Sequence, residues 1–252
     1  MMPDVTGVAP RQEYPSPPVH EVICQVTFAD PVPWSAATPG LLYRAVQDEY
    51  PAEPKSQTAV EASFDPSDGE VQVSRGAQRF VYSNEEQNRR FVVNERCLSV
   101  NALKPYENWP SLAQRFRRAL DIFEKEVAEF KSASVSLRYI NRIVIQGTAI
   151  DTSEYFTVPL VTTHQPNARI VGFFGRSQSI SPETSINTTV TFASVEHSVD
   201  GESAFILDID LAMPTPSDAG HDKLAELVNE LHHWENHEFE SSITDKCRKL
   251  FK

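Results

Sequence analysis

The sequence predicts a fold of the α+β class, made of two similar halves of antiparallel sheet, each followed by a long amphipathic helix. Groups of strand-like segments follow one another without intervening helices, and each group ends in a long segment with helical periodicity. This order occurs twice, at an interval of about 120 residues, which suggests an internal duplication. The predicted division is a flexible lead-in over 1–18, a first half over 19–131 and a second half over 132–252.

A doubly wound parallel sheet is disfavoured. Strands and helices do not alternate along the chain, and neither of the glycine-rich phosphate-binding motifs, GxGxxG and GxxxxGK[ST], is present. With only 9 glycines in 252 residues, the chain has few places for a loop that wraps a phosphate group. The helices are therefore expected on a common side of antiparallel sheets.

The first half begins after a proline-rich stretch that can form neither a helix nor a central strand. From His20 to Phe28 the residues alternate between apolar and mixed side chains, which is typical of a half-buried strand. A short helix is expected over 41–50, ended by Pro51. Further strands are expected over 57–64, 70–74, 78–83 and 90–103.

The long helix of the first half is predicted over 110–130. Asn108 is a suitable N-cap, Pro110 fits the first turn, and apolar residues then recur at helical spacing. The second half repeats the plan with a long strand over 134–145 and a final helix over 224–251. Between them, strands are expected near 168–174, 184–196 and 203–213.

Composition limits the class of protein. An apolar content of 40% is enough for a sizeable core, and the three cysteines show neither disulfide-framework nor zinc-site spacing. No apolar run approaches the roughly 20 residues needed to cross a bilayer, and the first residues do not resemble a signal peptide. We therefore expect a cytoplasmic protein with no membrane segment and no cofactor.

The net charge of −12 argues against a general nucleic-acid-binding protein, because such proteins neutralise phosphates with a basic face. Three short clusters of basic residues are nevertheless present. They would form one positive patch if folding brought them together, but solvated surface charge is the more ordinary interpretation. The clusters are Arg89 and Arg90; Arg115, Arg117 and Arg118; and Lys246, Arg248 and Lys249.

Four phrases in the sequence together resemble an uncharacterised, sporadically distributed bacterial protein family of about this length. They are Pro17-Pro18-x-x-Glu21 at the start of a strand, Leu103-x-x-Tyr106-x-x-Trp109, Arg138-Tyr139-Ile140-Asn141, and Leu231-His232 with Phe239 and Ile243-Thr244. The resemblance extends from about Pro17 to the C-terminus. It implies no activity, cofactor or catalytic residue, but the patchy occurrence of such genes suggests a setting such as bacterial defence or a toxin–antitoxin pair.

The final helix carries a polar trio, His232, Glu235 and Asn236, on or beside its apolar stripe. This position predicts a half-buried polar cluster in which the carboxylate would hold the imidazole in one tautomer, as a general base requires. A structural role is the alternative, since buried polar groups are normally paired to brace the fold. His233, His237 and Glu240 have ligand-like spacing, but the order differs from HExxH, and we predict no metal site.

Asp208 and Asp210 lie two residues apart on a predicted strand, so both carboxylates project from one face. Such pairs hold magnesium in phosphoryl-transfer enzymes. Arg138 and Arg142 share a face of another strand in the same way, so the acids and arginines would pair across the sheet if the two strands were neighbours. Asn141 is expected on the opposite, core side of its strand, where its amide would bond to backbone groups.

The leading hypothesis is a non-enzymatic binding or accessory protein that holds a protein partner or a small ligand, with nucleic acid disfavoured. It predicts a concave sheet surface or an apolar groove, with Arg138, Arg142, Asp208 and Asp210 as charged groups available to the partner. The alternative is a metal-dependent enzyme acting on a phosphorylated or nucleotide substrate. The polar trio of the final helix, His232, Glu235 and Asn236, is a second candidate binding set.

Overall fold

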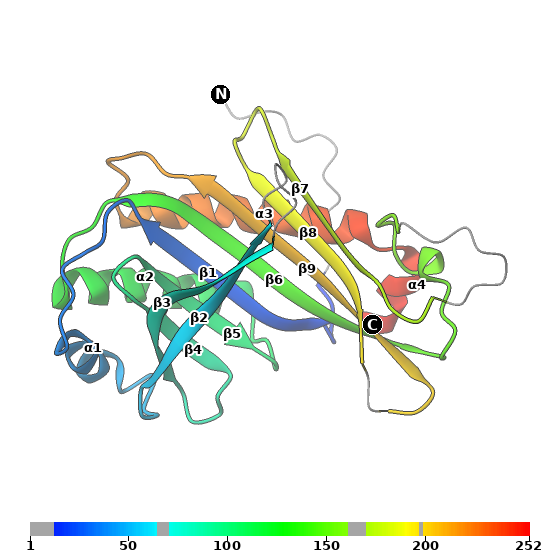
Figure 1. The fold of residues 1–252 in the computed structure, drawn as a ribbon, viewed down its shortest axis with the longest axis horizontal. Helices are drawn as coiled ribbons and strands as arrows, with labels where there is room; N and C mark the ends of the chain where they lie inside the picture. The colour runs from blue at the N-terminus through cyan, green and yellow to red at the C-terminus, as the bar shows by residue number, and fades with distance from the viewer. Residues whose placement is uncertain (1–12, 65–70, 161–169, 197–198) are drawn as a thin grey trace.

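The structure is a computed structural model that describes residues 13–64, 71–160, 170–196 and 199–252. In this part of the chain, nine strands form one antiparallel sheet, and four α-helices accompany it, which confirms the α+β class (Figure 1). The strands are β1 (Val19–Phe28), β2 (Lys55–Phe64), β3 (Val71–Ser83), β4 (Arg89–Val93), β5 (Cys97–Leu103), β6 (Ser132–Gln146), β7 (Phe174–Ile180), β8 (Asn187–Val195) and β9 (Glu202–Pro214). The helices are α1 (Thr38–Val46), α2 (Trp109–Glu126), α3 (His221–Ser242) and α4 (Asp245–Arg248).

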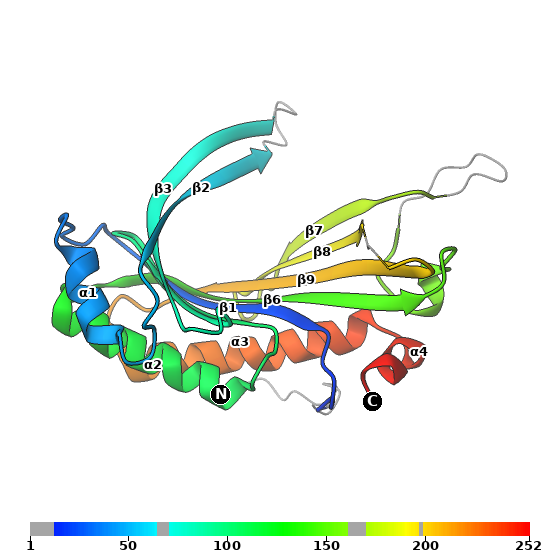
Figure 2. The ribbon, with the colours of Figure 1, turned by 90° about the horizontal axis from the view of Figure 1, so that it is seen from below.

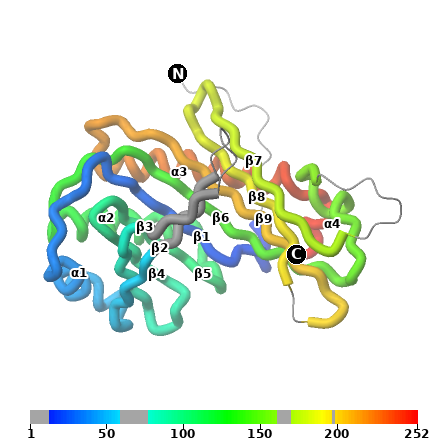
Figure 3. The backbone as a smooth tube through the Cα atoms, in the orientation of Figure 1, coloured from blue at the N-terminus to red at the C-terminus, as the bar shows by residue number. Residues whose placement is uncertain are grey.

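The strand order in the sheet is β2-β3-β4-β5-β1-β6-β9-β8-β7. The first strand of each sequence half, β1 or β6, is therefore central (Figure 3). The two strands pair with each other, with Cys24 opposite Leu137. The two halves consequently share one continuous sheet, which the separate patterns in the sequence did not reveal.

All four helices lie on one face of this sheet, as expected (Figure 2). Helix α2 packs on β5 and on α3, and α3 packs on β6 and β9. The core lies between the helices and this face, and Leu120, Leu137 and Leu207 are among the side chains it buries completely. Complete burial of a leucine contributes about 2 kcal/mol to folding, so this single apolar layer is the main source of stability.

The start of α2 follows the predicted pattern. The Asn108 side chain accepts a hydrogen bond from the backbone N–H of Ser111 at 2.9 Å, and Pro110 occupies the first turn. The buried residues on one side of the helix include Leu112, Phe116 and Phe123. The cap satisfies an N–H that has no partner within the helix, while the apolar stripe fixes which side faces the sheet.

The prediction for the final helix was wrong at its C-terminal end. Helix α3 stops at Ser242 because Ile243 pairs with Phe156 in a β-bridge, and the backbone N–H of Thr244 donates to the carbonyl of Tyr155. The Thr244 side chain then caps the short helix α4. These tertiary contacts override the helical periodicity that continues through the sequence.

Several predicted strand boundaries also differ. The stretch expected to form strands over 70–74 and 78–83 is the single strand β3, whereas 90–103 is divided into β4 and β5. The division is a turn held by Asn94, whose side-chain oxygen accepts from the backbone N–H groups of Arg96 and Cys97. Strand β7 begins at Phe174, where the predicted strand 168–174 ends; positions 168 and 169 lie outside the described residues.

The strands at the two ends of the sheet rise away from the helix layer, so the sheet is concave on the side opposite the helices (Figure 2). We call this side the open face. Within the described residues, none of the helices covers it. No helix in the same part of the chain has the length and apolar character needed to cross a membrane.

Candidate functional site

The residues singled out in the sequence occupy two places, on opposite faces of the sheet. Arg138, Arg142, Asp208 and Asp210 lie on the open face, whereas the polar trio of α3 lies on the helix side. Successive residues of a strand point to opposite faces, so β6 contributes to both places. Its buried positions alternate regularly along the strand.

The predicted pairing of acids and arginines across the sheet is confirmed for Arg138 and Asp208. Strands β6 and β9 are neighbours, and the Arg138 guanidinium donates to both carboxylate oxygens of Asp208, at 2.8 and 2.6 Å. Burial raises the pKa of the neighbouring Asp210 carboxyl above its usual value, with the positive charge of Arg138 opposing this rise. Arg142 is on the same face, opposite Ile206 in the ladder. Because Arg138 occupies both oxygens of Asp208, the Asp208–Asp210 pair is not arranged as a free carboxylate pair for magnesium.

The middle of the open face contains a hollow of about 400 Å³. Arg79 from β3, Arg90 from β4 and Arg138 from β6 line it, together with Asp210 and several uncharged polar side chains. Arg90 lies 3.9 Å from Glu21, and the buried Nε atom of Arg79 has no hydrogen-bond partner among the described residues. We call this feature the arginine hollow. Arg90 belongs to one of the basic clusters of the sequence, but nothing in the local sequence marked Arg79, because only strand pairing brings these two residues beside Arg138.

On the helix side, a pocket of about 300 Å³ lies where β6, α3 and the start of α2 meet residues 13–18 of the lead-in and Val19 of β1. We call it the helix-side pocket. The described part of the lead-in is held by a hydrogen bond from the Tyr14 hydroxyl to Glu240 at 2.7 Å. The backbone N–H of Ser16 also donates to the carbonyl of Phe251. The lead-in thus forms one wall of the pocket.

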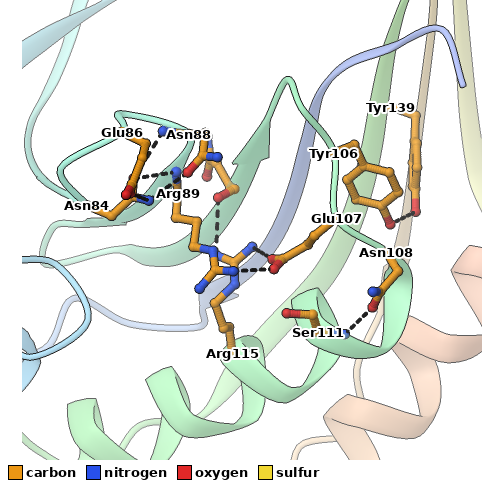
Figure 4. Close-up of polar contacts among 11 residues, drawn as sticks. Asn84, Glu86, Asn88, Arg89, Tyr106, Glu107, Asn108, Ser111, Arg115 and Tyr139 are labelled. Atoms are coloured by element: carbon orange, nitrogen blue, oxygen red, sulfur yellow. Dashed lines mark hydrogen bonds and ion pairs between the residues drawn. The ribbon is translucent and has the colours of Figure 1, made fainter. Parts of the chain in front are cut away.

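His232 is the most constrained member of the polar trio. Its ring stacks on Trp109 with 4.2 Å between ring centroids, and its Nδ1 atom lies 3.2 Å from the Tyr139 hydroxyl. The Asn236 amide donates to the His232 carbonyl at 2.7 Å. The Tyr139 hydroxyl in turn lies 3.1 Å from that of Tyr106 (Figure 4). A partly buried hydroxyl–imidazole chain therefore crosses from the loop before α2 to α3, through two tyrosines that the site prediction did not include.

Glu235 is the least satisfied member of the trio. It is 3% exposed, it lines the helix-side pocket, and no described residue donates a hydrogen bond to its carboxyl group. Burial raises the pKa of this carboxyl to about 8, with the charges of Glu240 and Glu238 adding to the rise. At neutral pH the group is therefore mostly protonated. The predicted burial of His232 and Glu235 is confirmed, but no described hydrogen bond joins the Glu235 carboxyl to the His232 imidazole, so the predicted carboxylate–imidazole pair is not seen.

Glu107, at the edge of the same pocket, has the opposite environment. It lies between Arg89 and Arg115, with its two carboxylate oxygens 2.5 and 2.8 Å from their nitrogens (Figure 4). Burial alone would raise its pKa, but a hydrogen bond from the Ser111 side chain and the charge of Arg115 lower the pKa below its usual value. Arg115 is 6% exposed and also donates to the carbonyl of Asn101.

The basic clusters are largely occupied by acids. Arg117 pairs with Asp222, Arg118 with Glu49, Lys246 with Glu154 and Arg248 with Glu240. The ordinary interpretation of solvated, paired charge therefore fits these clusters better than one merged patch. Among the described residues, no group of three or more His, Cys, Asp or Glu side chains has an arrangement suited to a metal ion.

No protein-family model matches the sequence, and no curated protein is significantly similar to it. The structure nevertheless brings together residues from all four of the phrases on which the family resemblance depends. Eight of these residues line the helix-side pocket: Pro17, Pro18, Tyr106, Trp109, Tyr139, Asn141, His232 and Phe239.

Proposed function

We propose that this chain is a non-enzymatic binding protein whose open face holds an acidic segment of a protein partner. The observation that carries this proposal is the arginine hollow. Three guanidinium groups, of Arg79, Arg90 and Arg138, line one depression with a single carboxylate, in a chain of net charge −12. Asp208 binds Arg138 and Glu21 lies beside Arg90, so Arg79 is the guanidinium of the lining that pairs with no described acid, and its charge favours an anionic partner there.

The geometry suits carboxylate groups. A guanidinium donates two parallel hydrogen bonds to a carboxylate, as Arg138 already does to Asp208. Arg138 is thereby fixed in place, while the buried Nε of Arg79 has no partner in the part of the chain that the structure describes. The hollow lies in a concave face that the described helices leave uncovered, so an extended peptide has access along the sheet.

The charge of the whole molecule favours a protein over a nucleic acid. A nucleic acid would bring a continuous row of phosphates toward a chain of net charge −12, and toward Asp208, Asp210 and Glu21 on the same face. A short acidic segment requires only local complementarity. The family resemblance adds a setting to the proposal, a bacterial defence or toxin–antitoxin gene pair in which the partner is encoded nearby.

The duplication inferred from the sequence is also part of the proposal. The order β3-β4-β5-β1 on one side of the sheet corresponds to β7-β8-β9-β6 on the other, and α2 and α3 each follow the last strand of their half. A repeated unit joined through its first strand would produce this arrangement. The arginine hollow includes residues of β1 and β6, so it lies at the junction of the two halves.

The test uses a fluorescein-labelled peptide of glutamate and serine, with a lysine and serine peptide of the same length for comparison. Fluorescence anisotropy should show binding of the acidic peptide only, and the affinity should fall as salt is raised. The Arg79→Gln, Arg90→Gln double variant should bind at least about tenfold more weakly, because it removes two charged donors.

Arg117→Gln is the matched control, since Arg117 is an exposed arginine on α2 and is absent from the hollow. It removes one positive charge without changing the proposed site, and it should bind as the unmodified protein does. Equal binding by the double variant and the unmodified protein would contradict the proposal. Preferential binding of a single-stranded oligonucleotide over the acidic peptide would replace it with a nucleic-acid function.

A further inference from the structure

The helix-side pocket lies on the other side of the sheet from the open face. The function proposed for the open face therefore gives this pocket no role. We propose that this pocket binds a small organic cation, an amine whose ammonium group pairs with the carboxylate of Glu235. Glu235 is 3% exposed, lines the pocket and receives no hydrogen bond from a described residue. Burial leaves this carboxyl little contact with water, so a ligand that supplies donors there replaces hydrogen bonds that it otherwise lacks.

The charges around the pocket favour a cation. Four carboxyl groups line it, those of Glu13, Glu107, Glu235 and Glu240, and no Lys or Arg side chain is among its described lining residues. Arginines outside the lining neutralise two of the four, because Arg89 and Arg115 bind Glu107 and Arg248 binds Glu240. The Glu235 carboxyl is the one that is both deeply buried and without such a partner among the described residues.

The walls fit the apolar part of such a molecule. Aromatic side chains from four segments surround the pocket: Tyr14, Tyr106, Trp109, Tyr139 and Phe239. Aromatic rings pack against an alkyl or aryl body and attract a nearby ammonium group through their electron-rich faces. A volume of about 300 Å³ is at the small end of ligand pockets, which suits a monoamine of modest size.

The side-chain amides of Asn141 and Asn236 also line the pocket and offer oxygens that can accept from an ammonium group. Asn141 is 2% exposed and already donates to the carbonyl of Leu207 at 3.3 Å, which fixes the orientation of its amide. The three N–H groups of the ligand's ammonium can therefore donate to two kinds of acceptor, the Glu235 carboxylate and the amide oxygens of the asparagines. A neutral alcohol of the same shape would supply only one donor and no charge.

Binding should release a proton. Burial and the nearby charges of Glu240 and Glu238 on α3 keep Glu235 protonated at neutral pH. The other ionisable groups at the pocket are His232 on α3, Tyr139 on β6, Glu107 and Tyr106 before α2, and Glu13 and Tyr14 in the lead-in. When an ammonium ion binds, the carboxyl O–H bond breaks, the proton passes to solvent, and the resulting carboxylate pairs with the cation.

The experiment is isothermal titration calorimetry of the whole chain with three amines, phenethylamine, butylamine and putrescine, near pH 7. Titration in two buffers with different ionisation enthalpies measures the protons released. At least one amine should bind with release of part of one proton, while 2-phenylethanol and butanol should bind at least about tenfold more weakly. Failure of all three amines to bind below about 10 mM would overturn the proposal.

Glu235→Gln tests the assigned residue, because glutamine keeps the shape of the protonated acid but cannot ionise. We expect at least about a tenfold loss of amine affinity and no proton release, with the folded state retained as judged by circular dichroism. Glu230→Gln, an exposed change on the same helix, should bind amine as the unmodified protein does. Unchanged affinity in Glu235→Gln would overturn the assignment. The Arg79→Gln, Arg90→Gln variant should still bind amine, so failure here is distinguishable from failure of the open-face proposal.

Discussion

At the scale of single residues, two glutamates show how surroundings decide the behaviour of one side-chain type. Glu107 lies between two arginines, and its pKa is lowered. Glu235 is buried and receives no hydrogen bond from a described residue, and burial raises its pKa to about 8. Glu107 is a structural acid that joins a loop to α2. Glu235, in contrast, can still accept hydrogen bonds, and this capacity is unused. An unused, buried capacity of this kind is a stronger indication of a ligand than burial alone.

Replacing Glu235 with Gln should make stability less dependent on pH. Between its usual pKa of 4.5 and about 8, the native carboxyl keeps a proton that the unfolded chain has released. The free energy of unfolding of the natural protein therefore falls as pH rises through this range, by an amount on the order of a few kcal/mol. Glu235→Gln should show a smaller fall, and urea unfolding at pH 5 and pH 8 measures it. An equal fall in both proteins would show that Glu235 ionises normally.

Glu107 and Arg115 should be energetically coupled. Their side chains meet at 2.8 Å and are mostly removed from water, so removal of either leaves the other as a poorly solvated charge. Glu107→Gln and Arg115→Met should each destabilise the fold. The double variant should lose about 1 to 3 kcal/mol less than the sum of the two losses. Urea denaturation of the four proteins gives the coupling energy, and simple additivity would contradict the role assigned to this pair.

At the scale of elements, the sequence was informative wherever local pattern and tertiary packing agree. The cap at Asn108, the stripe of α2 and the alternation of β6 and β9 were predicted because they follow helical or strand periodicity. The end of α3 could not be predicted, since Ile243 leaves the helix to pair with Phe156, far away in the sequence. Periodicity reports which face is apolar, and it carries no information about such distant pairing.

The same limit applies to the candidate sites. The stripe of α3 placed His232 and Glu235 at the core surface correctly, because their positions are local to one helix. The partners Trp109 and Tyr139 come from other elements, and Arg79 enters the hollow only through the pairing of β3 and β4. Sequence alone therefore predicted single site members, and the fold was needed to show which residues meet.

Asn108 provides a test at this scale. Its side chain accepts from the Ser111 N–H, so Asn108→Ala should remove one cap and destabilise the protein by about 1 kcal/mol. Asn108→Asp keeps an acceptor at the same place and should be close to neutral. The midpoint of urea unfolding at constant slope measures both changes. Equal midpoints for Asn108→Ala and the unmodified protein would mean that water replaces the cap at no cost.

At the scale of the whole molecule, one layer of sheet separates the two candidate sites. Arg138 faces the arginine hollow, and the next residue, Tyr139, faces the helix-side pocket. Strand alternation thus allows a single element, β6, to fix the geometry of both sites. Because β6 also pairs with β1, both halves of the sequence share the strand on which the sites depend.

This shared pairing predicts that the two halves unfold together. Leu137 in β6 is fully buried, and Leu137→Ala should cost about 2 to 5 kcal/mol through lost burial and the cavity left behind. Two variants that keep only Trp34 or only Trp234 report on the first and second half respectively. In both single-tryptophan variants, Leu137→Ala should lower the urea midpoint of the fluorescence transition by the same amount. The midpoint measured by far-UV circular dichroism should fall by that amount too. If the Trp234 transition alone moved, the halves would be independent units, and the continuous sheet would join them without making them cooperative.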